Sequence, residues 1–291
     1  MSNSHETSKA LIRVGVHVSI AGGLVKAVQR AHDLDCDTMQ VFSKSPRGWA
    51  ARPLDPNDAD RAFALRQEWG IGPFAVHAPY LINLASADEV LYERSIAAFA
   101  DELSRCALIR ADFLVVHVGC VREGQRDGLD RVARALGRVL QRPASGHHDP
   151  VVLLENTAGR RGEVGSRFEE LAELVERVGK DRVGVCLDTC HTFAAGYDIS
   201  TRAGLGSVAK TLDSLIGWSS VKLIHANDSK QGLGSHMDRH QHIGQGAIGR
   251  PGFQVLLHHP GLRQIPMVLE TPKRSDADDV RNLSVMRSLA G

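Results

Sequence analysis

The chain has 291 residues, and 43% of them are hydrophobic, enough to build the core of one large α/β domain or of two small ones. Its formal net charge is only +1, which excludes the broad basic surface by which many proteins hold nucleic acid through their overall field. A nucleic-acid partner would have to be held by local groups. Fourteen histidines are many for this length, so we expect some of them to be functional.

The N-terminal residues and the cysteines favour a cytoplasmic location. Residues 1–10 are predicted to be a polar tail without the apolar segment of a signal peptide, and no run approaches the ~20 apolar residues of a membrane span. Five cysteines without the spacing of a small disulfide-bonded domain predict reduced thiols. Because no linker or shift in composition divides residues 11–291, we expect them to form one domain.

Eight short apolar runs recur along the chain, and each is predicted to be a strand. They are residues 11–17, 38–42, 73–77, 113–117, 151–155, 183–188, 221–225 and 266–270. The runs are almost continuously apolar, which is typical of strands buried on both faces of a parallel sheet. Apolar residues spaced i, i+3, i+4 predict helices between them, over 23–33, 88–109, 128–141, 167–178 and 276–289.

This alternation of strands and helices predicts an α/β protein with a single (β/α)8 TIM barrel, whose active site lies at the C-terminal ends of the strands. The competing architecture is an open, doubly wound sheet. Such a sheet usually has a glycine-rich nucleotide-binding turn after its first strand, but the turn here is SIAGG (19–23) and not GxGxxG.

Seven of the eight runs end in an ionisable residue, which a core strand does not need. These residues are His17, His77, His117, Glu155, Asp188, His225 and Glu270. Three more candidates lie in loops on the same predicted face, namely His191, Asp238 and His240. In a TIM barrel, all of these side chains would converge on one cleft.

Taken singly, each residue has a structural interpretation: a histidine at a strand end is often only hydrogen-bonded, and a buried glutamate is often paired with arginine. Four carboxylates in one cleft would nevertheless repel one another and raise each other's pKa values unless cations neutralise them. Few arginines or lysines lie near these strand ends in the sequence, so we expect divalent metal ions. Imidazole and carboxylate ligands suit zinc, manganese or iron. The nine candidates other than His17 suffice for three ions if carboxylates bridge.

Several segments resemble the endonuclease IV family, the trinuclear-zinc apurinic/apyrimidinic endonucleases of base-excision repair. They are GVHVSIAGG (15–23), FSKSPRGW (42–49), HAPYLIN (77–83), LENTAG (154–159), LDTCHTFAAGYD (187–198), HANDSK (225–230), DRHQHIGQGAIG (238–249) and LET (269–271). The resemblance runs in order from about residue 13 to 273. It departs from the family pattern at Val118 and Ala226, neither of which is a ligand position.

The resemblance implies how the ligands are grouped. His77 and His117 would hold one Zn²⁺, and Glu155 would bridge it to a second ion, completed by Asp188, His225 and Glu270. His191, Asp238 and His240 would hold a third, with Mn²⁺ or Fe²⁺ as alternatives to Zn²⁺ at some sites. His17 would have a supporting role and would not be a ligand.

The implied reaction is hydrolysis of the phosphodiester 5′ to an abasic site by a metal-bound hydroxide, leaving a 3′-hydroxyl and a 5′-deoxyribose phosphate. Glu270 and Glu155 would be catalytic, and removal of 3′-blocking groups would be a side activity. The partner would be double-stranded DNA containing abasic sites. The protein would be a monomer that associates with the nucleoid through its substrate and has no contact with a membrane.

Residues in the loops after the second and third strands are expected to contact DNA. By resemblance, Arg47 and Tyr80 would enter the duplex and fill the gap left by an extruded sugar, with Trp49 nearby. Lys44, together with Lys230 and Arg250, is a candidate phosphate contact. Ordinary packing of the aromatic residues and a solvated surface for the cations are the competing interpretations.

Two other classes of function remain open from the sequence. A sugar isomerase or epimerase on a similar barrel would use one or two metal ions and fewer ligands, and the third group of ligands argues against it. A metal-dependent DNA-binding module would bind DNA without cutting it.

Overall fold

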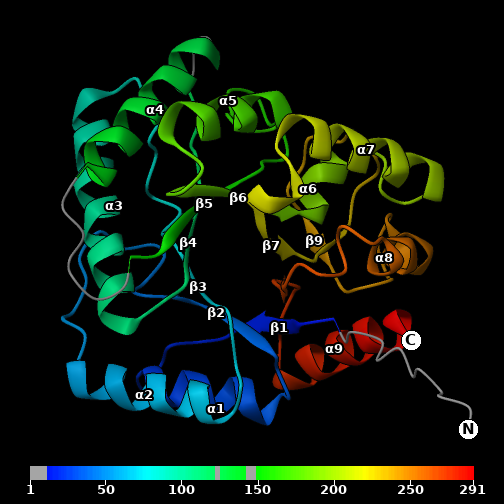
Figure 1. Ribbon diagram of the computed structural model, residues 1–291, viewed down its shortest axis with the longest axis horizontal. Coiled ribbons are helices and arrows are strands. Elements are labelled where there is room, and N and C mark those ends of the chain that lie inside the picture. Colours follow the sequence, from blue (N-terminus) through cyan, green and yellow to red (C-terminus); the bar gives the residue numbers. More distant parts are fainter. Residues whose placement is uncertain (1–11, 122–124, 142–148) are drawn as a thin grey trace, which may run out of the picture.

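The computed structural model describes residues 12–121, 125–141 and 149–291 (Figure 1). The predicted tail, residues 1–10, lies outside the described residues, so the division into a tail and one domain stays a prediction. No helix among the described residues is long and apolar enough to cross a membrane. All five cysteines are free thiols, in agreement with the sequence.

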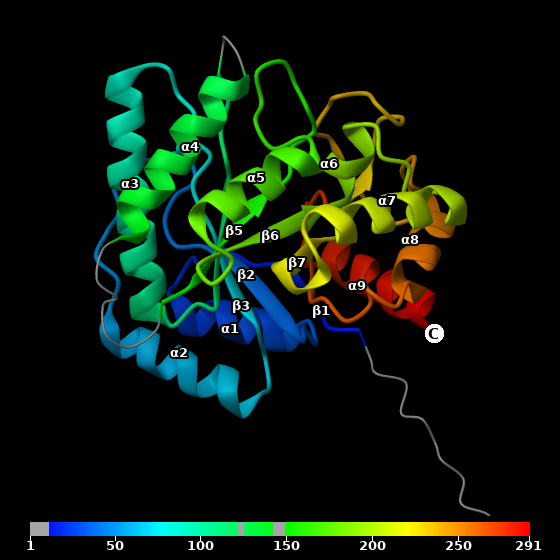
Figure 2. The same cartoon turned by 45° about the horizontal axis from the view of Figure 1, so that its top comes forward.

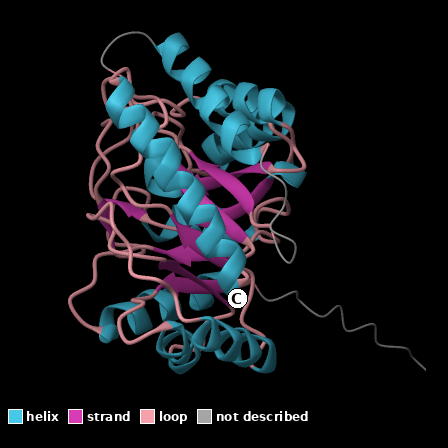
Figure 3. Cartoon of the chain, turned by 90° about the vertical axis from the view of Figure 1, so that its left-hand side faces the viewer, coloured by secondary structure: helices cyan, strands magenta, loops and turns pink. Residues whose placement is uncertain are grey.

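Eight parallel strands close into a barrel in the order β1-β10-β7-β6-β5-β4-β3-β2, which confirms the predicted TIM barrel and excludes the open sheet. The strands are β1 (Val14–His17), β2 (Thr38–Phe42), β3 (Phe74–His77), β4 (Phe113–His117), β5 (Val151–Glu155), β6 (Val183–Asp188), β7 (Val221–His225) and β10 (Met267–Leu269). All eight predicted strands are present, and five of them have the predicted bounds. Figure 3 shows the strands enclosed between helices.

Helices surround the barrel and cover the outer face of its strands (Figures 1 and 2). They are α1 (Leu24–Asp33), α2 (Pro56–Glu68), α3 (Glu89–Ile109), α4 (Gln125–Leu140), α5 (Phe168–Val178), α6 (Thr189–Ala194), α7 (Arg202–Leu215), α8 (Gly249–His258) and α9 (Asp276–Ala290), with a short 3₁₀ helix at Trp218–Ser220. The clearly amphipathic helices turn an apolar stripe toward the barrel. On α5, for example, the stripe consists of Phe168, Leu171, Leu174 and Val175, all buried.

The five predicted helices are confirmed with bounds shifted by no more than three residues, whereas α2, α6, α7 and α8 were not assigned from the sequence. The apolar signal of α2 is weak because its buried residues are only Ala59, Ala62 and Arg66. Helix α6 has six residues, too few to show a periodicity. Helix α8 contains Pro251 and Gly252 in its first turn, which obscured its start.

The interior of the barrel holds a small apolar cluster with one residue from each of six strands. Its members are Ala75, Val115, Leu153, Cys186, Leu223 and Val268. Side chains alternate along a strand, so the residue two positions later points into the barrel again, one step nearer its mouth. Those positions are His77, His117, Glu155, Asp188, His225 and Glu270. Six of the predicted ligands therefore lie together at the mouth of the barrel.

A second, two-stranded antiparallel sheet carries the remaining part of the site. It pairs β8 (Asp228–Ser229) with β9 (His240–Gln241). The buried carboxylate of Asp228 accepts hydrogen bonds from backbone N–H groups in the loop after β9, including those of Gly244, Gly246 and Ile248. This carboxylate therefore fixes the loop that follows Asp238 and His240.

Gly15 is required by the contact between β1 and β2. It is paired with Thr38, and a Cβ atom at Gly15 would lie 1.7 Å from the Thr38 carbonyl oxygen. We predict that Gly15→Ala lowers the free energy of unfolding by about 1–3 kcal/mol because the strands must separate. The control, Gly206→Ala on the exposed side of α7, meets open space and should raise stability by about 0.5–1 kcal/mol through helix propensity. Urea denaturation measures both; equal effects would contradict the packing argument.

Candidate metal centre

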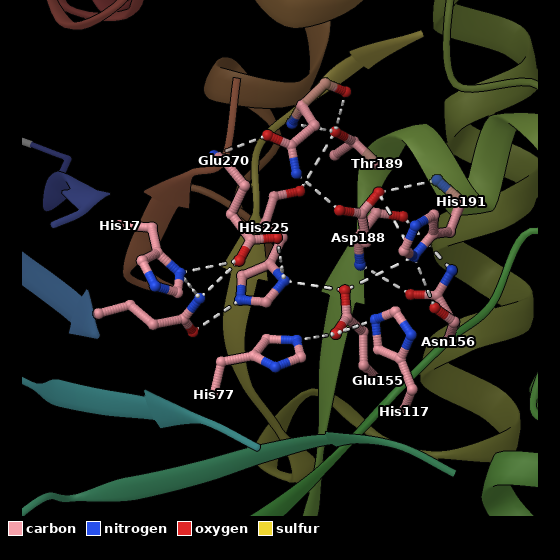
Figure 4. A network of polar contacts seen from close by, with 12 residues as sticks. His17, His77, His117, Glu155, Asn156, Asp188, Thr189, His191, His225 and Glu270 are labelled. Carbon is pink, nitrogen blue, oxygen red and sulfur yellow. Dashed lines mark hydrogen bonds and ion pairs between the residues drawn. The ribbon is translucent and has the colours of Figure 1, made fainter. Parts of the chain in front are cut away.

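The structure brings all nine predicted ligands together at the mouth of the barrel. Figure 4 labels those other than Asp238 and His240. The donor atoms of the nine ligands form three groups, each with its atoms within 4.8 Å of one another: His77, His117 and Glu155; Glu155, Asp188, His225 and Glu270; and His191, Asp238 and His240. Glu155 belongs to two groups, so it has the position of a bridging ligand. Cys190 lies near Asp188 and His240, but burial raises the pKa of its thiol to about 12, which makes it a poor ligand.

In the first group, hydrogen bonding fixes the tautomer of His77. Its Nδ1 lies 2.7 Å from the carbonyl oxygen of Ala78, which can only accept, so Nδ1 carries the proton. The Nε2 of a neutral His77 then directs its lone pair at Glu155 Oε2, 3.1 Å away, and His117 Nε2 approaches the same oxygen at 2.9 Å. Lone pairs that face a carboxylate need a proton or a metal ion between them.

In the second group, Gln40 orients two ligands. The Nε2 of His225 lies 2.9 Å from Gln40 Oε1 and donates to it, which leaves Nδ1 of His225 directed at Glu155 Oε1 (2.9 Å) and Glu270 Oε2 (3.3 Å). The amide nitrogen of Gln40 donates to Glu270 Oε1 at 2.7 Å. One amide therefore sets both the tautomer of a histidine and the orientation of a carboxylate, as expected of a residue that supports metal ligands.

The third group shows the clearest fit to a metal ion. His191 Nδ1 donates to the carbonyl oxygen of Asn156 (2.9 Å), and His240 Nδ1 donates to that of Glu270 (3.0 Å). The two Nε2 atoms are buried, and neither makes a hydrogen bond within the described part of the chain. Both lie 3.3 Å from Asp238 Oδ1. Two orphaned imidazole nitrogens and a carboxylate around one point suit a cation.

The electrostatics of the centre lead to the same conclusion. Burial alone would raise the pKa of Glu155, but His117 and His225 oppose this and hold it well below its usual value. Burial would lower the pKa of His191, yet Asp188 and Asp238 raise it well above its usual value. The buried carboxylates therefore demand positive charge, which protons on the imidazoles or bound metal ions must provide.

Comparison with known proteins shows which family shares this sequence and fold. A family model described as xylose isomerase-like TIM barrel matches residues 28–289. A protein named probable endonuclease 4 from Methanoculleus marisnigri is 45% identical and covers 97% of this chain and 100% of its own, and one from Chloroflexus aurantiacus is 46% identical over 95% and 98%. The crystal structure of endonuclease IV from Thermus thermophilus aligns with a TM-score of 0.84 and 42% identity, covering 95% of this chain and 98% of that one. The chain belongs to the endonuclease IV family.

Membership of this family confirms the predicted enzyme class, deoxyribonuclease IV, over the sugar isomerase and the binding module. A D-tagatose 3-epimerase-like protein also aligns, with a TM-score of 0.70. At 20% identity, that likeness shows only that the barrel is shared.

Three polar side chains that sequence analysis missed hold the ligands of this endonuclease IV in place. Besides Gln40, Asn227 donates to Asp188 Oδ2 (2.7 Å) and accepts from the backbone N–H of Glu270 (2.8 Å). Asn156 accepts from the backbone N–H of Asp188 at 2.7 Å. Asn156 and Asn227 lie one and two residues after a strand end, and that position is the signal that would have revealed them. His17, 3.2 Å from Glu270, is placed as expected for a supporting residue.

Of the residues expected to contact DNA, Tyr80 lies beside this centre, and all but one are at least partly exposed. Tyr80 is 60% exposed, and its ring centroid is 5.7 Å from that of His77 and 6.0 Å from that of His117. Arg47 is exposed, and Trp49 is half-buried. Lys230 and Arg250 are also exposed.

The exception is Lys44, for which the expectation of a phosphate contact was wrong. Its side chain is only 3% exposed, and its ammonium lies 2.9 Å from Glu102 and 3.0 Å from Asp101. An ammonium buried between two carboxylates does not reach a phosphate outside the protein. Lys44 therefore has a structural role and attaches the loop that follows β2 to helix α3.

The contacts of Gln40 predict a measurable effect on metal affinity. Gln40→Leu keeps the approximate volume but removes both hydrogen bonds, so we expect metal to bind about 10- to 100-fold more weakly. Competition with a chromophoric chelator measures the affinity without reference to activity. The matched control is Gln254→Leu on the exposed side of α8, which should leave it unchanged. Wild-type affinity in Gln40→Leu would show that Gln40 does not orient the ligands.

Proposed function

We propose that this enzyme hydrolyses the phosphodiester 5′ to an abasic site in double-stranded DNA and leaves a 3′-hydroxyl and a 5′-deoxyribose phosphate. The observation that carries the proposal is the set of nine donors in three groups, two of which share Glu155, in a chain related to endonuclease IV over nearly its whole length. The same centre would remove blocking groups from 3′ ends, since these are also phosphodiesters or phosphomonoesters of a terminal sugar. The enzyme would act as a monomer.

The three groups would hold three Zn²⁺ ions, the first by His77 and His117, the third by His191, Asp238 and His240, and the second by the remaining ligands with Glu155 as the bridge. Three divalent ions against four carboxylates leave the centre with a charge of about +2, suited to an anionic phosphodiester. When bound, zinc lowers the pKa of water from 15.7 to about 7 and neutralises charge on the phosphate oxygens. Mn²⁺ and Fe²⁺ accept the same ligand types, and elemental analysis distinguishes them.

Among the carboxylate ligands at the strand ends, Glu270 is the best placed to orient the attacking water. Its side chain is 14% exposed, whereas those of Glu155 and Asp188 are fully buried. Gln40 and His17 contact Glu270 Oε1. The other oxygen, Oε2, points toward His225. The water attacks phosphorus in line, and the bond from phosphorus to the 3′ oxygen of the preceding nucleotide breaks.

Recognition of damage would depend on Arg47, Tyr80 and Trp49. Arg47 and Tyr80 are exposed side chains in the loops after β2 and β3, on the side of the barrel that carries the metal centre. We propose that both enter the duplex where the abasic sugar has left the stack. An abasic nucleotide has no base to unstack, so extruding it costs less than extruding an intact nucleotide. Selectivity then requires no reading of sequence.

A nicking assay on a plasmid with one abasic site tests the function. We expect conversion of the supercoiled form to the nicked form, loss of this activity after exhaustive chelation, and recovery on adding Zn²⁺. The intact plasmid is the control for selectivity. Binding without nicking would indicate a DNA-binding module, and equal nicking of both plasmids would remove the proposed recognition of abasic sites. Elemental analysis should find three metal ions per chain.

Glu270→Gln separates chemistry from binding. The substitution keeps the size of the side chain and removes its charge, so we expect incision to fall by about 100-fold or more while the affinity for abasic duplex stays within a few-fold. Single-turnover cleavage and fluorescence anisotropy of labelled DNA measure the two. Glu176→Gln, on the exposed side of α5, is the control. Near-normal turnover of Glu270→Gln would refute the role of Glu270.

A further inference from the structure

The loop between β2 and α2, residues 43–55, carries Arg47 and Trp49 and is held at both ends by Arg105 of helix α3. At the start of this 43–55 loop, Arg105 Nη2 donates to the carbonyl oxygen of Ser43 (2.6 Å), and Nε donates to its hydroxyl (2.8 Å). Toward the end of the loop, Nη1 donates to the carbonyl oxygen of Arg52 (3.0 Å). One planar guanidinium thus fixes the distance between the two ends.

Glu102 of α3 completes this attachment from within the protein. It is fully buried; its Oε2 accepts from the hydroxyl of Ser43 (2.7 Å), and its Oε1 lies 2.9 Å from Lys44 Nζ. Together with Asp101, the attachment contains two cations and two carboxylates, so its charges balance. Replacing Glu102 would remove one of the two carboxylates that contact Lys44 and the acceptor of the Ser43 hydroxyl, and buried pairs of this kind hold one geometry firmly.

A third contact from α3 reaches the middle of the loop. The guanidinium carbon of Arg94 lies 4.3 Å from the centroid of the Trp49 ring, a cation–π contact. Glu102 and Arg105 are 8 and 11 residues after Arg94 on α3, so all three project from one side of the helix. Arg47 lies between the contacts at Ser43 and Trp49 and remains exposed.

Part of the 43–55 loop borders a pocket rather than closely packed side chains. The pocket has a volume of about 560 Å³ and is lined by residues that include Ile20, Leu24, Ala51, Leu54 and Arg105. Along this pocket, the polar contacts with α3 hold the loop together with the packing of Leu54 against the core.

We propose that Glu102 and Arg105 are positioning residues for damage recognition, which hold the 43–55 loop in the conformation that presents Arg47 to the duplex. This inference rests on the proposed recognition of abasic DNA. A loop ordered in advance loses less conformational entropy when DNA binds, and the gain appears as affinity for the damaged site. The chemical step at the metal centre is not altered.

The first test compares Glu102→Gln with Glu93→Gln. Glu93 is also on α3 but forms an exposed ion pair with Arg138, away from the loop. For Glu102→Gln we expect affinity for the abasic duplex to weaken and KM to rise by about tenfold, with kcat within about twofold, unchanged metal content and unchanged affinity for intact duplex. Glu93→Gln should match wild type. A loss confined to kcat, or equal losses on both duplexes, would overturn the proposal.

A double-mutant cycle with Arg47→Ala shows whether Glu102 acts through Arg47. If it does, Glu102→Gln should lower the affinity for abasic DNA only slightly once Arg47 is absent. The double variant should then bind abasic DNA about as weakly as Arg47→Ala alone. Additive losses would show that Glu102 acts independently of Arg47 and would overturn the proposal.

The order of the loop can also be read without DNA from the fluorescence of Trp49, in a chain where Trp69 and Trp218 are replaced by phenylalanine. Glu102→Gln should increase quenching of Trp49 by acrylamide and lower its anisotropy, whereas Glu93→Gln should not. Unchanged fluorescence in a folded Glu102→Gln overturns the anchoring, even if the enzyme proves inactive on abasic DNA. Should Glu102→Gln fail to fold, Arg105→Lys, which keeps the charge but loses the fork of donors, is judged by the same measurements.

Discussion

The need to neutralise buried carboxylates governs the whole centre. Glu155 and Asp188 are fully buried, and no arginine or lysine is paired with either within the described residues. The histidines around them do not satisfy this need as neutral groups, because backbone carbonyls hold the protons of His77 and His191 on Nδ1 and turn the Nε2 lone pairs inward. The chain therefore preorganises an array of lone pairs, and cations are what this array can bind. Metal binding and the stability of this end of the barrel should be linked.

The strands of the barrel and the loops supply different groups of ligands. Strands supply the first two groups because inward positions recur every two residues, so an apolar interior layer is followed by a layer of ligands. The third group comes from outside the strands of the barrel: His191 from α6, and Asp238 and His240 from the β8–β9 region that Asp228 secures. Sugar epimerase structures share the barrel at 20% identity or less, so the barrel does not determine the reaction. The loops add a third group of donors to the two that the strands supply.

Strand periodicity made most of the fold and the clustering of the nine candidate ligands predictable from the sequence, whereas contacts between distant segments were missed. Six candidates were found because apolar runs stop at ionisable residues, and His191 lies three residues after one of them. Asp238 and His240 came from the loop after the seventh strand and from the family resemblance. Gln40 was missed because the run 38–42 was taken to end at Phe42, although Gln40 occupies the inward position in register with His17. Lys44 was misjudged because its partners, Asp101 and Glu102, lie on a helix more than fifty residues away. A charged pair such as Glu102 and Arg105 on the inner side of a helix is the signal that would have corrected it.

The proposed chemistry and the proposed recognition place different demands on the structure. The candidate metal ligands at the strand ends are held by buried hydrogen bonds, so their geometry should change little when a substrate binds. Arg47 and Tyr80 are exposed and stand on loops, where a conformation has to be maintained by specific contacts. Buried charge is balanced differently at the two places. At the barrel mouth, no lysine or arginine is paired with Glu155 or Asp188 within the described residues, whereas Lys44 of the 43–55 loop lies 2.9 Å from Glu102. The first arrangement leaves a place for metal, and the second leaves none and fixes a loop.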